Sequence, residues 1–415
     1  MRLLMIVPYY EPDLGPSAPL FTLLSQELVN RGHQVVVITT VPHYPTGYVT
    51  AEYQGKLIYH SSSNCVEVHR VSVPSVSRAN LAKRLLQFFC YQIGATLVGI
   101  GQKYDAVLVA NPALWVWLPF FFHVYLRRKP AIFSIHDVFP DVGINLGIFR
   151  SKPVIWVVAW LERFCLSNAK FVRILSDSFK PGLRALGVPD EKLALIYDWV
   201  DIDLIQPINL CNRFAEENQL CDKFVILYAG NIGFSQGLEN VLFAAKWLAE
   251  QDHLVEFVFV GEGAERQQLM AQAAQLQLAN VRFLPFQPRE RLSEVLATAN
   301  IALVPLRTGI GFGSLPSKTY SILASGRPLL ASVDAGTEIR QLIEEAEAGF
   351  CVPPEDAVAL ANAILALKND PELCQILGRN GRHWAELHHS PKAAAKRFED
   401  LFISAIGQHH QMETQ

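Results

Sequence analysis

The sequence has few charged residues and no paired cysteine motif. Only 18% of its 415 residues are charged and the net charge is -3, which argues against a nucleic acid as the partner. The seven cysteines form no C-x-x-C pair and stand at positions 65, 90, 165, 211, 221, 351 and 374. Their odd number and their spacing argue against a disulfide framework and against a zinc site, and they favour a reducing cytoplasm. We therefore expect a cytoplasmic protein without a metal.

Membrane-spanning and targeting segments are also missing. No apolar run reaches the length of a transmembrane helix, and residues 3–8 have the length of a strand rather than the pattern of a signal peptide. Two shorter apolar runs, 112–126 and 153–161, are rich in aromatic residues, and basic residues 127–129 follow the first. Such segments either contact an anionic membrane surface, here the inner face of the cell membrane, or form buried helices.

What the sequence does contain is a regular alternation of strands and helices. Half of the residues are hydrophobic, and short apolar strands alternate with helical patterns, which is typical of parallel βαβ units. A chain of this length is too long for one core, so two domains are expected. We predict an α/β protein with Rossmann-like domains over 1–205 and 222–388, joined by an irregular connection over 203–222.

Three glycine-bearing loops follow strands of the second domain, at 230–237, 261–263 and 309–314. The carboxyl ends of parallel strands share one sheet edge, so these loops predict a nucleoside diphosphate site. Ser314 is the expected N-cap of the next helix, with Pro316 and Lys318 in its first turn. A lysine there opposes the helix dipole unless a phosphate lies in front of it. The alternative is a surface lysine beside a turn.

A polar cluster of the first domain also directly follows a strand. His136 follows the strand at 131–135, at the sheet edge where ligand sites of α/β proteins gather. The alternative is a histidine that only closes a loop. Neither G-x-G-x-x-G nor the P-loop pattern occurs, which counts against a dinucleotide dehydrogenase.

With these motifs in order, the sequence resembles the retaining glycosyltransferases of family four, which have the GT-B fold of two Rossmann-like domains facing a central cleft. It is most similar to those of colanic acid, exopolysaccharide and O-antigen synthesis. The resemblance covers nearly the whole chain. Its motifs are Pro8-Tyr9-Tyr10-x-Pro12, Arg31-Gly32-His33-x-Val35, Pro42-His43-Tyr44-Pro45-Thr46-Gly47, Gly230-Asn231-Ile232-Gly233-x-x-Gln236-Gly237, Val260-Gly261-Glu262-Gly263, Pro316-Ser317-Lys318 and Ala324-Ser325-Gly326-Arg327-Pro328.

The resemblance implies an acceptor-binding first domain, a donor-binding second domain, and a last helix, 390–408, that packs back on the first domain. It implies that Gly15 and Ser17 approach the donor phosphate and that His136 faces the transferred sugar. Lys318 would hold the diphosphate. The further donor-binding residues that it implies are Gly230, Asn231, Gly233, Gln236, Gly261, Glu262, Gly313, Ser314, Leu315 and Ser317.

The sequence departs from the family at the acidic pair Glu-x7-Glu. Gly313 and Ser321 stand where the family carries these two carboxylates, and Asn231 and Gln236 replace a common arginine and lysine. We hypothesise that Glu338, at the start of another helix, supplies a polar contact to the donor instead.

The resemblance implies a transfer of sugar from UDP-sugar or GDP-sugar to the hydroxyl of a saccharide acceptor, with retention and without a cofactor. A lipid-linked acceptor agrees with the apolar aromatic runs. Two alternatives stay open: an epimerase or hydrolase of sugar nucleotides on the same fold, and a non-catalytic partner subunit. The base, the sugar, the acceptor and the oligomeric state stay open as well.

Overall fold

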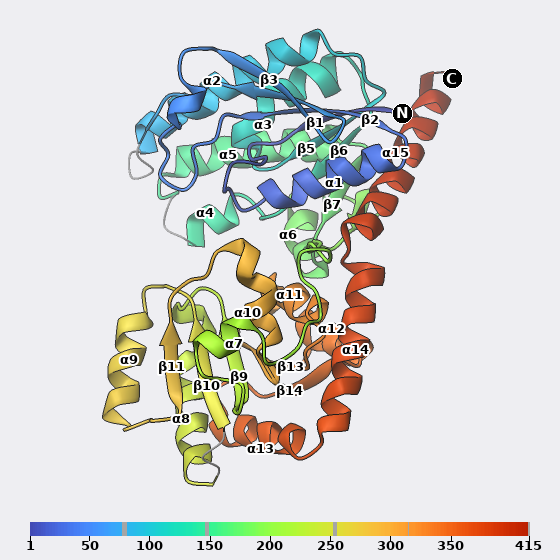
Figure 1. The fold of residues 1–415 in the computed structure, drawn as a ribbon. Coiled ribbons are helices and arrows are strands. Elements are labelled where there is room, and N and C mark those ends of the chain that lie inside the picture. Colours follow the sequence, from blue (N-terminus) through green and yellow to red (C-terminus); the bar gives the residue numbers. More distant parts are fainter. Residues whose placement is uncertain (77–80, 146–148, 252–254, 314, 414–415) are drawn as a thin grey trace. The chain divides into compact units, whose positions relative to one another are not determined.

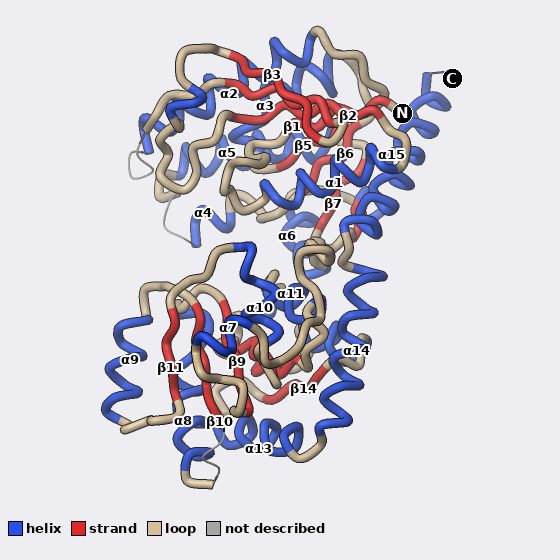
Figure 2. The backbone as a smooth tube through the Cα atoms, in the orientation of Figure 1, coloured by secondary structure: helices blue, strands red, loops and turns tan. Residues whose placement is uncertain are grey.

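The computed structural model describes residues 1–76, 81–145, 149–251, 255–313 and 315–413. The chain divides into two compact units, each with its own sheet and its own helices (Figures 1 and 2). Unit 1 comprises Met1–Asp198 and Pro391–Gln415, and unit 2 comprises Trp199–Ser390. The strands of both sheets are parallel except for one edge strand of unit 1, so the expected α/β class is confirmed.

The sheet of unit 1 has eight strands in the order β3-β4-β2-β1-β5-β6-β7-β8. Its strands are β1 (Arg2–Ile6), β2 (Gln34–Thr40), β3 (Ile58–Ser63), β4 (Val66–Val71), β5 (Ala106–Ala110), β6 (Ala131–Ser134), β7 (Phe171–Ile174) and β8 (Leu193–Leu195). The central strands are continuous apolar runs because helices cover both faces of a parallel sheet. The edge strand β3 pairs antiparallel with β4 and was not expected, because its sequence IYHSSS lacks an apolar run.

The helices of unit 1 are α1 (Ala18–Asn30), α2 (Leu81–Ile100), α3 (Ala113–Phe120), α4 (Asp141–Asn145), α5 (Lys152–Asn168), α6 (Lys180–Ala185) and α15 (Pro391–Glu413). Helix α3 continues as a π-helical turn over Phe121–Leu126, so the apolar run at 112–126 is helical. Helix α3 packs between α2 and α5. In the part of the chain that the structure describes, no helix is both long and apolar enough to span a membrane.

The last helix packs on unit 1. In Figure 1, α15 (red) lies beside α1 (blue), and its Phe398 and Phe402 are fully buried. Glu399 of α15 forms ion pairs with Arg31 and with His33, whose Nε2 lies 2.8 Å from the carboxylate. Arg31 and His33 flank Gly32, where the chain leaves α1 with φ +89°. The Arg-Gly-His motif therefore both ends α1 and attaches α15.

The sheet of unit 2 has six parallel strands in the order β11-β10-β9-β12-β13-β14. They are β9 (Phe224–Ala229), β10 (Val255–Val260), β11 (Val281–Leu284), β12 (Ile301–Pro305), β13 (Leu329–Ser332) and β14 (Gly349–Val352). The helices are α7 (Arg213–Glu217), α8 (Leu238–Ala249), α9 (Arg266–Gln275), α10 (Leu292–Ala297), α11 (Lys318–Ala324), α12 (Glu338–Glu345), α13 (Ala357–Lys368) and α14 (Pro371–His388).

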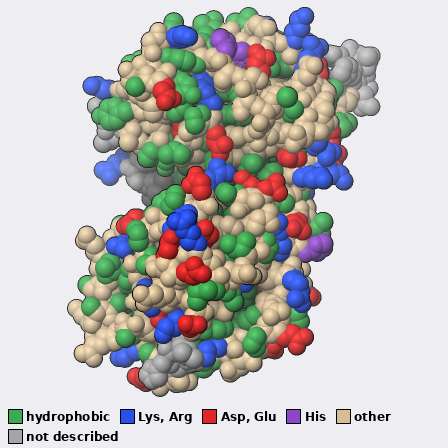
Figure 3. All heavy atoms as spheres, in the orientation of Figure 1, with side chains coloured by type: hydrophobic (Ala, Val, Ile, Leu, Met, Phe, Trp, Pro, Cys, Tyr) green, Lys and Arg blue, Asp and Glu red, His purple; other side chains and the backbone are tan. Residues whose placement is uncertain are grey.

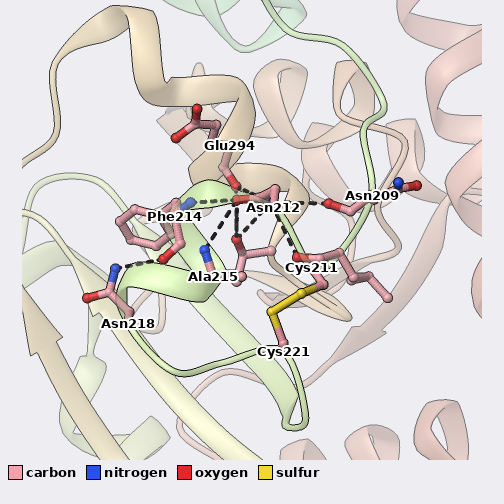
Figure 4. Close-up of a disulfide and its surroundings, with 10 residues drawn as sticks. Asn209, Cys211, Asn212, Phe214, Ala215, Asn218, Cys221 and Glu294 are labelled. Atoms are coloured by element: carbon pink, nitrogen blue, oxygen red, sulfur yellow. Dashed lines mark hydrogen bonds between the residues drawn. A yellow bond between two sulfur atoms is a disulfide. The ribbon is translucent and has the colours of Figure 1, made fainter.

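The segment 203–222 corrects two expectations. It is not irregular, because it contains α7, and it belongs to unit 2. It also carries a disulfide between Cys211 and Cys221, although the cysteine spacing argued against disulfides (Figure 4). Asn212 caps α7 by accepting hydrogen bonds from the N–H groups of Phe214 and Ala215. The capped helix turns the chain back, so that the Cα atoms of the two cysteines lie 4.7 Å apart.

Candidate functional site

Two of the predicted glycine loops pair closely at the carboxyl edge of the unit 2 sheet. Gly230 follows β9 and donates its N–H to the carbonyl of Val260 at 2.9 Å, and Ile232 donates to the carbonyl of Glu262 at 2.9 Å. Gly261 has φ +151°, and a Cβ there would lie 1.9 Å from the carbonyl oxygen of Gly230. Only glycine fits this approach, so the motif at 260–263 is required for the pairing of the loops.

Arg307 connects the third glycine loop to the first, and sequence reasoning assigned it no role. Its backbone N–H donates to the carbonyl of Ser235, and its Nε donates to the carbonyl of Phe234 at 2.6 Å. Its guanidinium lies 4.2 Å from the centre of the Phe234 ring and 2.5 Å from the carboxylate of Glu239. The only sequence signal was its place, two residues beyond the end of β12.

The helix that carries Lys318 begins later than predicted. Helix α11 starts at Lys318 itself with Ser317 as its N-cap, and Gly311–Gly313 forms a 3-10 turn. Pro316 therefore precedes the helix, and its carbonyl accepts a bond from the N–H of Thr319. The predicted cap Ser314 lies outside the described residues.

Lys318 is held by neutral groups. Its Nζ donates to the hydroxyl of Tyr228 at 2.6 Å, and that hydroxyl donates to the carbonyl of Asn231 at 2.5 Å. The Nζ also lies 3.1 Å from where a Cβ of Gly230 would be. Tyr228 was missed by sequence reasoning because, inside β9, it looks like one more core residue. It is buried, and it fixes the ammonium group beside the first glycine loop.

The charge of Lys318 has no anionic partner among the residues that the structure describes. Burial lowers the pKa of its ammonium group to about 8. A partly buried cation without a counter-charge costs free energy in the folded protein, and perturbed pKa values of this kind cluster at functional sites. An anionic ligand beside Gly230 would offset that cost.

Lys318 lines a pocket of about 130 Å³ at this sheet edge, together with Gly230, Ser321, Phe286 and Gln287. Phe286 is 71% exposed, which is unusual for a large apolar ring. Its face is available for stacking on a planar group, and the Gln287 amide can both donate and accept hydrogen bonds. Ser321, one of the positions where the family carries a carboxylate, offers a hydroxyl instead. The pocket therefore combines a cation, hydrogen-bonding groups and an aromatic ring.

The other predicted donor residues lie in these loops with different exposure. Gln236 accepts the N–H of Gly233 at 3.2 Å through its side chain, which shapes the first loop. Asn231, Glu262 and Ser317 are exposed, whereas Leu315 is buried.

Glu338 is the first residue of α12, and Thr337 is the N-cap of that helix. The segment before α12 reaches the third glycine loop, because Asp334 accepts the N–H of Gly309 at 2.7 Å. The loop also packs closely on Thr337, whose Cγ2 would lie 2.9 Å from a Cβ at Gly311. The structure thus brings the start of α12 to this loop.

In unit 1, the loop before α1 is fixed by buried contacts. Gly15 donates its N–H to the carboxylate of Asp13 at 2.8 Å, and Asp13 also accepts the N–H of His43 at 2.9 Å. A Cβ at Gly15 would lie 2.3 Å from the ring of Tyr9. Ser17 is the N-cap residue of α1, and its side chain makes no capping hydrogen bond. Its hydroxyl therefore is not required by the helix.

His136 lies beside the helix that follows this loop. Its ring meets the ring of Phe21 edge to face at 5.4 Å, and its backbone N–H donates to the side-chain oxygen of Asn111 at 2.9 Å. The pKa of its imidazole is lowered to about 4, chiefly by burial, with Asp198 opposing the shift and Arg173 adding to it. The imidazole is therefore neutral at pH 7 and can donate one hydrogen bond and accept another. Gly15, Ser17 and His136 share one sheet edge of unit 1.

No group of three or more metal-ligating side chains occurs within the described ranges of the chain.

Comparisons with known proteins agree with this geometry. A family model described as glycosyl transferase 4-like domain matches residues 18–199, and one described as glycosyl transferases group 1 matches residues 212–384. The chain is 29% identical over 374 residues to WcaI of Escherichia coli, which is described as a colanic acid biosynthesis glycosyl transferase. That alignment covers 88% of this chain and 91% of the relative.

Two solved structures share the fold. Sucrose-phosphate synthase of Thermosynechococcus elongatus has a TM-score of 0.71 at 20% identity, with 98% of this chain and 100% of that chain covered. HepE of Anabaena, solved in complex with UDP, has a TM-score of 0.69 at 16% identity, with 97% and 100% covered. The chain has the GT-B fold and belongs to the glycosyltransferases, with a 4-like first domain and a group 1 second domain.

Proposed function

We propose that this glycosyltransferase moves a sugar from a nucleoside diphosphate sugar to an acceptor hydroxyl with retention of anomeric configuration. The observation that carries the proposal is Lys318, a desolvated cation beside the paired glycine loops, which among the described residues is held by neutral groups. Negative charge grows on the diphosphate as the bond to the sugar breaks. A cation already in place stabilises that charge without reorganisation, which is a large source of catalysis.

The pocket beside Lys318 suits the nucleoside. The exposed ring of Phe286 and the amide of Gln287 can hold a base, and the hydroxyl of Ser321 can bond a ribose. A uracil nucleotide is the first choice for a donor, because HepE, which shares the fold, was solved with UDP. The ligands to be tested are UDP and GDP with their sugars. We keep Glu338 as a donor-binding residue, since α12 begins beside the third glycine loop.

In unit 1, the family resemblance implies that His136 faces the transferred sugar. A neutral imidazole suits this role, because it can bond a sugar hydroxyl without placing a second positive charge near the reacting carbon. The protein groups named here supply the positive field, so the reaction that we propose uses no cofactor.

We further propose a lipid-linked saccharide acceptor at an anionic membrane surface, in the synthesis of an exopolysaccharide or O-antigen. One face of α2 exposes apolar side chains at helical spacing, namely Leu85, Leu86, Phe89, Ile93, Leu97 and Ile100. Helix α5 exposes Val154, Trp156, Val157 and Trp160. Isolated apolar side chains are normal at protein surfaces, but two such rows on helices that flank α3 mark an interaction site.

The charges around these rows select an anionic partner. Across α2, α3 with its π-helical turn, and α5, the one acidic residue is Glu162, and it is buried. Exposed basic residues of this region include Arg128, Lys152 and Arg163. Figure 3 shows one face of the molecule, on which hydrophobic, basic and acidic side chains of unit 1 are all exposed. Aromatic side chains together with basic residues are typical of proteins that bind the inner leaflet of a membrane.

Thermal unfolding with UDP, GDP and their sugars tests the donor part. A ligand at about 100 times its dissociation constant adds ~2.7 kcal/mol of stability. We expect stabilisation by one base only, and loss of it in Lys318→Met. Stabilisation that survives in Lys318→Met would remove Lys318 from the site. The configuration of the product, read by NMR once an acceptor is found, tests retention.

Vesicle sedimentation tests the membrane part. We expect binding to vesicles with phosphatidylglycerol and not to pure phosphatidylcholine, with loss of binding in Trp156→Ser/Leu97→Ser. The matched control is Ile403→Ser, which removes an exposed apolar side chain from α15. Self-association of the wild type, abolished by the double substitution without any vesicle binding, would assign this face to a second copy instead.

A further inference from the structure

A second cavity of unit 2 lies at the opposite edge of its sheet. The cavity measures about 440 Å³, within the range of small-molecule sites. Its lining includes Phe224, the first residue of β9, Asn300, which precedes β12, and Pro328, which precedes β13. These are the amino ends of parallel strands, whereas the glycine loops follow the carboxyl ends. The cavity is therefore distinct from the pocket beside Lys318.

Positive charge predominates in the lining. Arg327, Arg379 and Arg382 all line the cavity, and Glu386 is the one carboxylate among the lining residues. Glu386 is already bound to Arg382, whose Nε donates to it at 2.6 Å. Arg382 is also saturated by neutral groups, since its Nη1 donates to the carbonyls of Ile205 and Ala324. The other two arginines, Arg327 and Arg379, thus have no counter-charge among the residues that the structure describes.

Of these two arginines, Arg327 gives the stronger indication of a ligand. Its Nη2 donates to the carbonyl of Ile208 at 2.5 Å, but its Nε is buried and has no hydrogen-bond partner among the described residues. Burial lowers the pKa of its guanidinium. A buried donor and an uncompensated charge each cost free energy unless a ligand satisfies them. Arg379, in contrast, is exposed and makes no hydrogen bond or ion pair with the described residues, so its guanidinium is available to a ligand.

Apolar side chains form much of the remaining lining, beside the polar Asn300, Gln375 and His383. Pro207, Leu210, Phe224 and Pro371 contribute side chains without charge. An inorganic ion would leave these walls uncovered, whereas a molecule with an apolar part would bury them. An arginine fork recognises phosphate and carboxylate groups with two parallel hydrogen bonds, and it is preferred to lysine for such ligands.

We propose that this cavity binds a small organic anion, a phosphate monoester or carboxylate with an apolar portion, through Arg327 and Arg379. The cavity also lies next to the end of the helix that carries Lys318. Helix α11 begins at Lys318, and the carbonyl of its last residue, Ala324, is held by Arg382 of the cavity. A ligand here therefore contacts the segment 326–328 directly after α11, while the donor pocket contacts its first residue.

Calorimetric titration of the full chain with phenyl phosphate tests the proposal. Phosphates can also meet Lys318, so the titration is repeated with Lys318→Met, Arg379→Gln and Lys246→Gln. Lys246→Gln is the matched control, because it removes an exposed positive charge from α8, away from the cavity lining. We expect equal affinity in wild type, Lys318→Met and Lys246→Gln, and affinity roughly tenfold or more weaker in Arg379→Gln.

Three results would overturn the proposal. Binding that is lost in Lys318→Met and kept in Arg379→Gln would place the anion at the glycine loops. Absence of binding to the wild type at millimolar phenyl phosphate would reject the site. Inorganic phosphate that binds as tightly as phenyl phosphate would show that the apolar walls make no contact. Arg379 is exposed and bonds to none of the described residues, so its substitution does not threaten folding. Arg327→Gln provides the second test where circular dichroism shows a folded protein.

Discussion

Replacing Lys318 by methionine should make the protein more stable and almost inactive. The ammonium group is partly buried against Tyr228 and Gly230, and no described residue places an anion beside it. Methionine keeps the length and the apolar contacts of the side chain but removes the charge. The substitution therefore removes a cost of folding and, at the same time, removes the cation that we assign to the leaving diphosphate.

The magnitude follows from the pKa of Lys318. A fall from the ordinary value of 10.5 to about 8 means that the folded state disfavours the charged form by at most about 3 kcal/mol. We expect a gain of about 1–3 kcal/mol at pH 7, which raises the Tm of a domain of this size by roughly 2–10 °C. Loss of one preorganised donor costs ~2.7–4 kcal/mol of barrier, so turnover should fall roughly 10²- to 10³-fold.

The stability difference between Lys318→Met and the wild type should change with pH in one direction. The folded pKa lies below the unfolded one, so the wild-type penalty is complete below pH 8 and disappears as pH rises from about 8 to 10.5. The advantage of Lys318→Met should therefore shrink over that interval. Nucleotide affinity of the wild type should fall above pH 8 as well, since Lys318 in the protein without nucleotide loses its proton there.

Scanning calorimetry at pH 7 and pH 10, together with a donor-turnover assay, measures both effects. Lys318→Arg is the informative comparison, because it keeps a charge but cannot place it at the same distance from Tyr228. A variant Lys318→Met that is less stable than wild type at pH 7 would contradict the argument from desolvation. A variant with normal turnover would contradict the role in catalysis.

Three other predictions concern the scaffold. Burial raises the pKa of Glu162 to about 8, so the folded state keeps its proton and stability is lost as pH rises from about 4.5 to 8; urea unfolding of Glu162→Gln should lack that slope, and an unchanged slope would contradict the burial. Replacing Cys211 and Cys221 by serine opens a short loop and should lower the free energy of unfolding by about 2–3 kcal/mol, measured by the same unfolding. The control is the wild type with its disulfide reduced, which should be as stable as the variant. Gly261→Ala would place a Cβ against the carbonyl of Gly230, and we expect lost nucleotide binding and at least about 1–3 kcal/mol of strain; unchanged binding would refute the close pairing of the loops.

Much of the fold was predictable because its signals are local. The strands β2, β4, β5 and β10 are recognisable in the sequence as short apolar runs at 34–40, 66–71, 106–110 and 255–260, as expected of buried parallel strands. The two strands that were missed, β3 and β14, lie at the edges of their sheets. An edge strand is covered less completely, so it needs no apolar run and gives a weaker pattern.

The candidate site was predictable only where a residue type is required by backbone geometry or by charge. Gly230, Gly261 and Lys318 stand out in the sequence, and the structure brings these three together. Tyr228 and Arg307 did not stand out. A tyrosine in a strand and an arginine after a strand are ordinary in a sequence, and only their contacts across unit 2 give them a role.

The sequence by itself determined the class of the protein: two α/β domains, glycine loops after the strands of the second, and a lysine where a helix dipole does not favour one. Each of these properties depends on neighbouring residues, because helix and strand periodicity, turns and caps act over a few positions. The tertiary structure alone decided that Cys211 forms a disulfide with Cys221, that Lys318 is desolvated beside Tyr228, and that Arg327 and Arg379 line one cavity. Burial and pairing depend on which distant segments pack together, and that packing sets whether a charge has a partner.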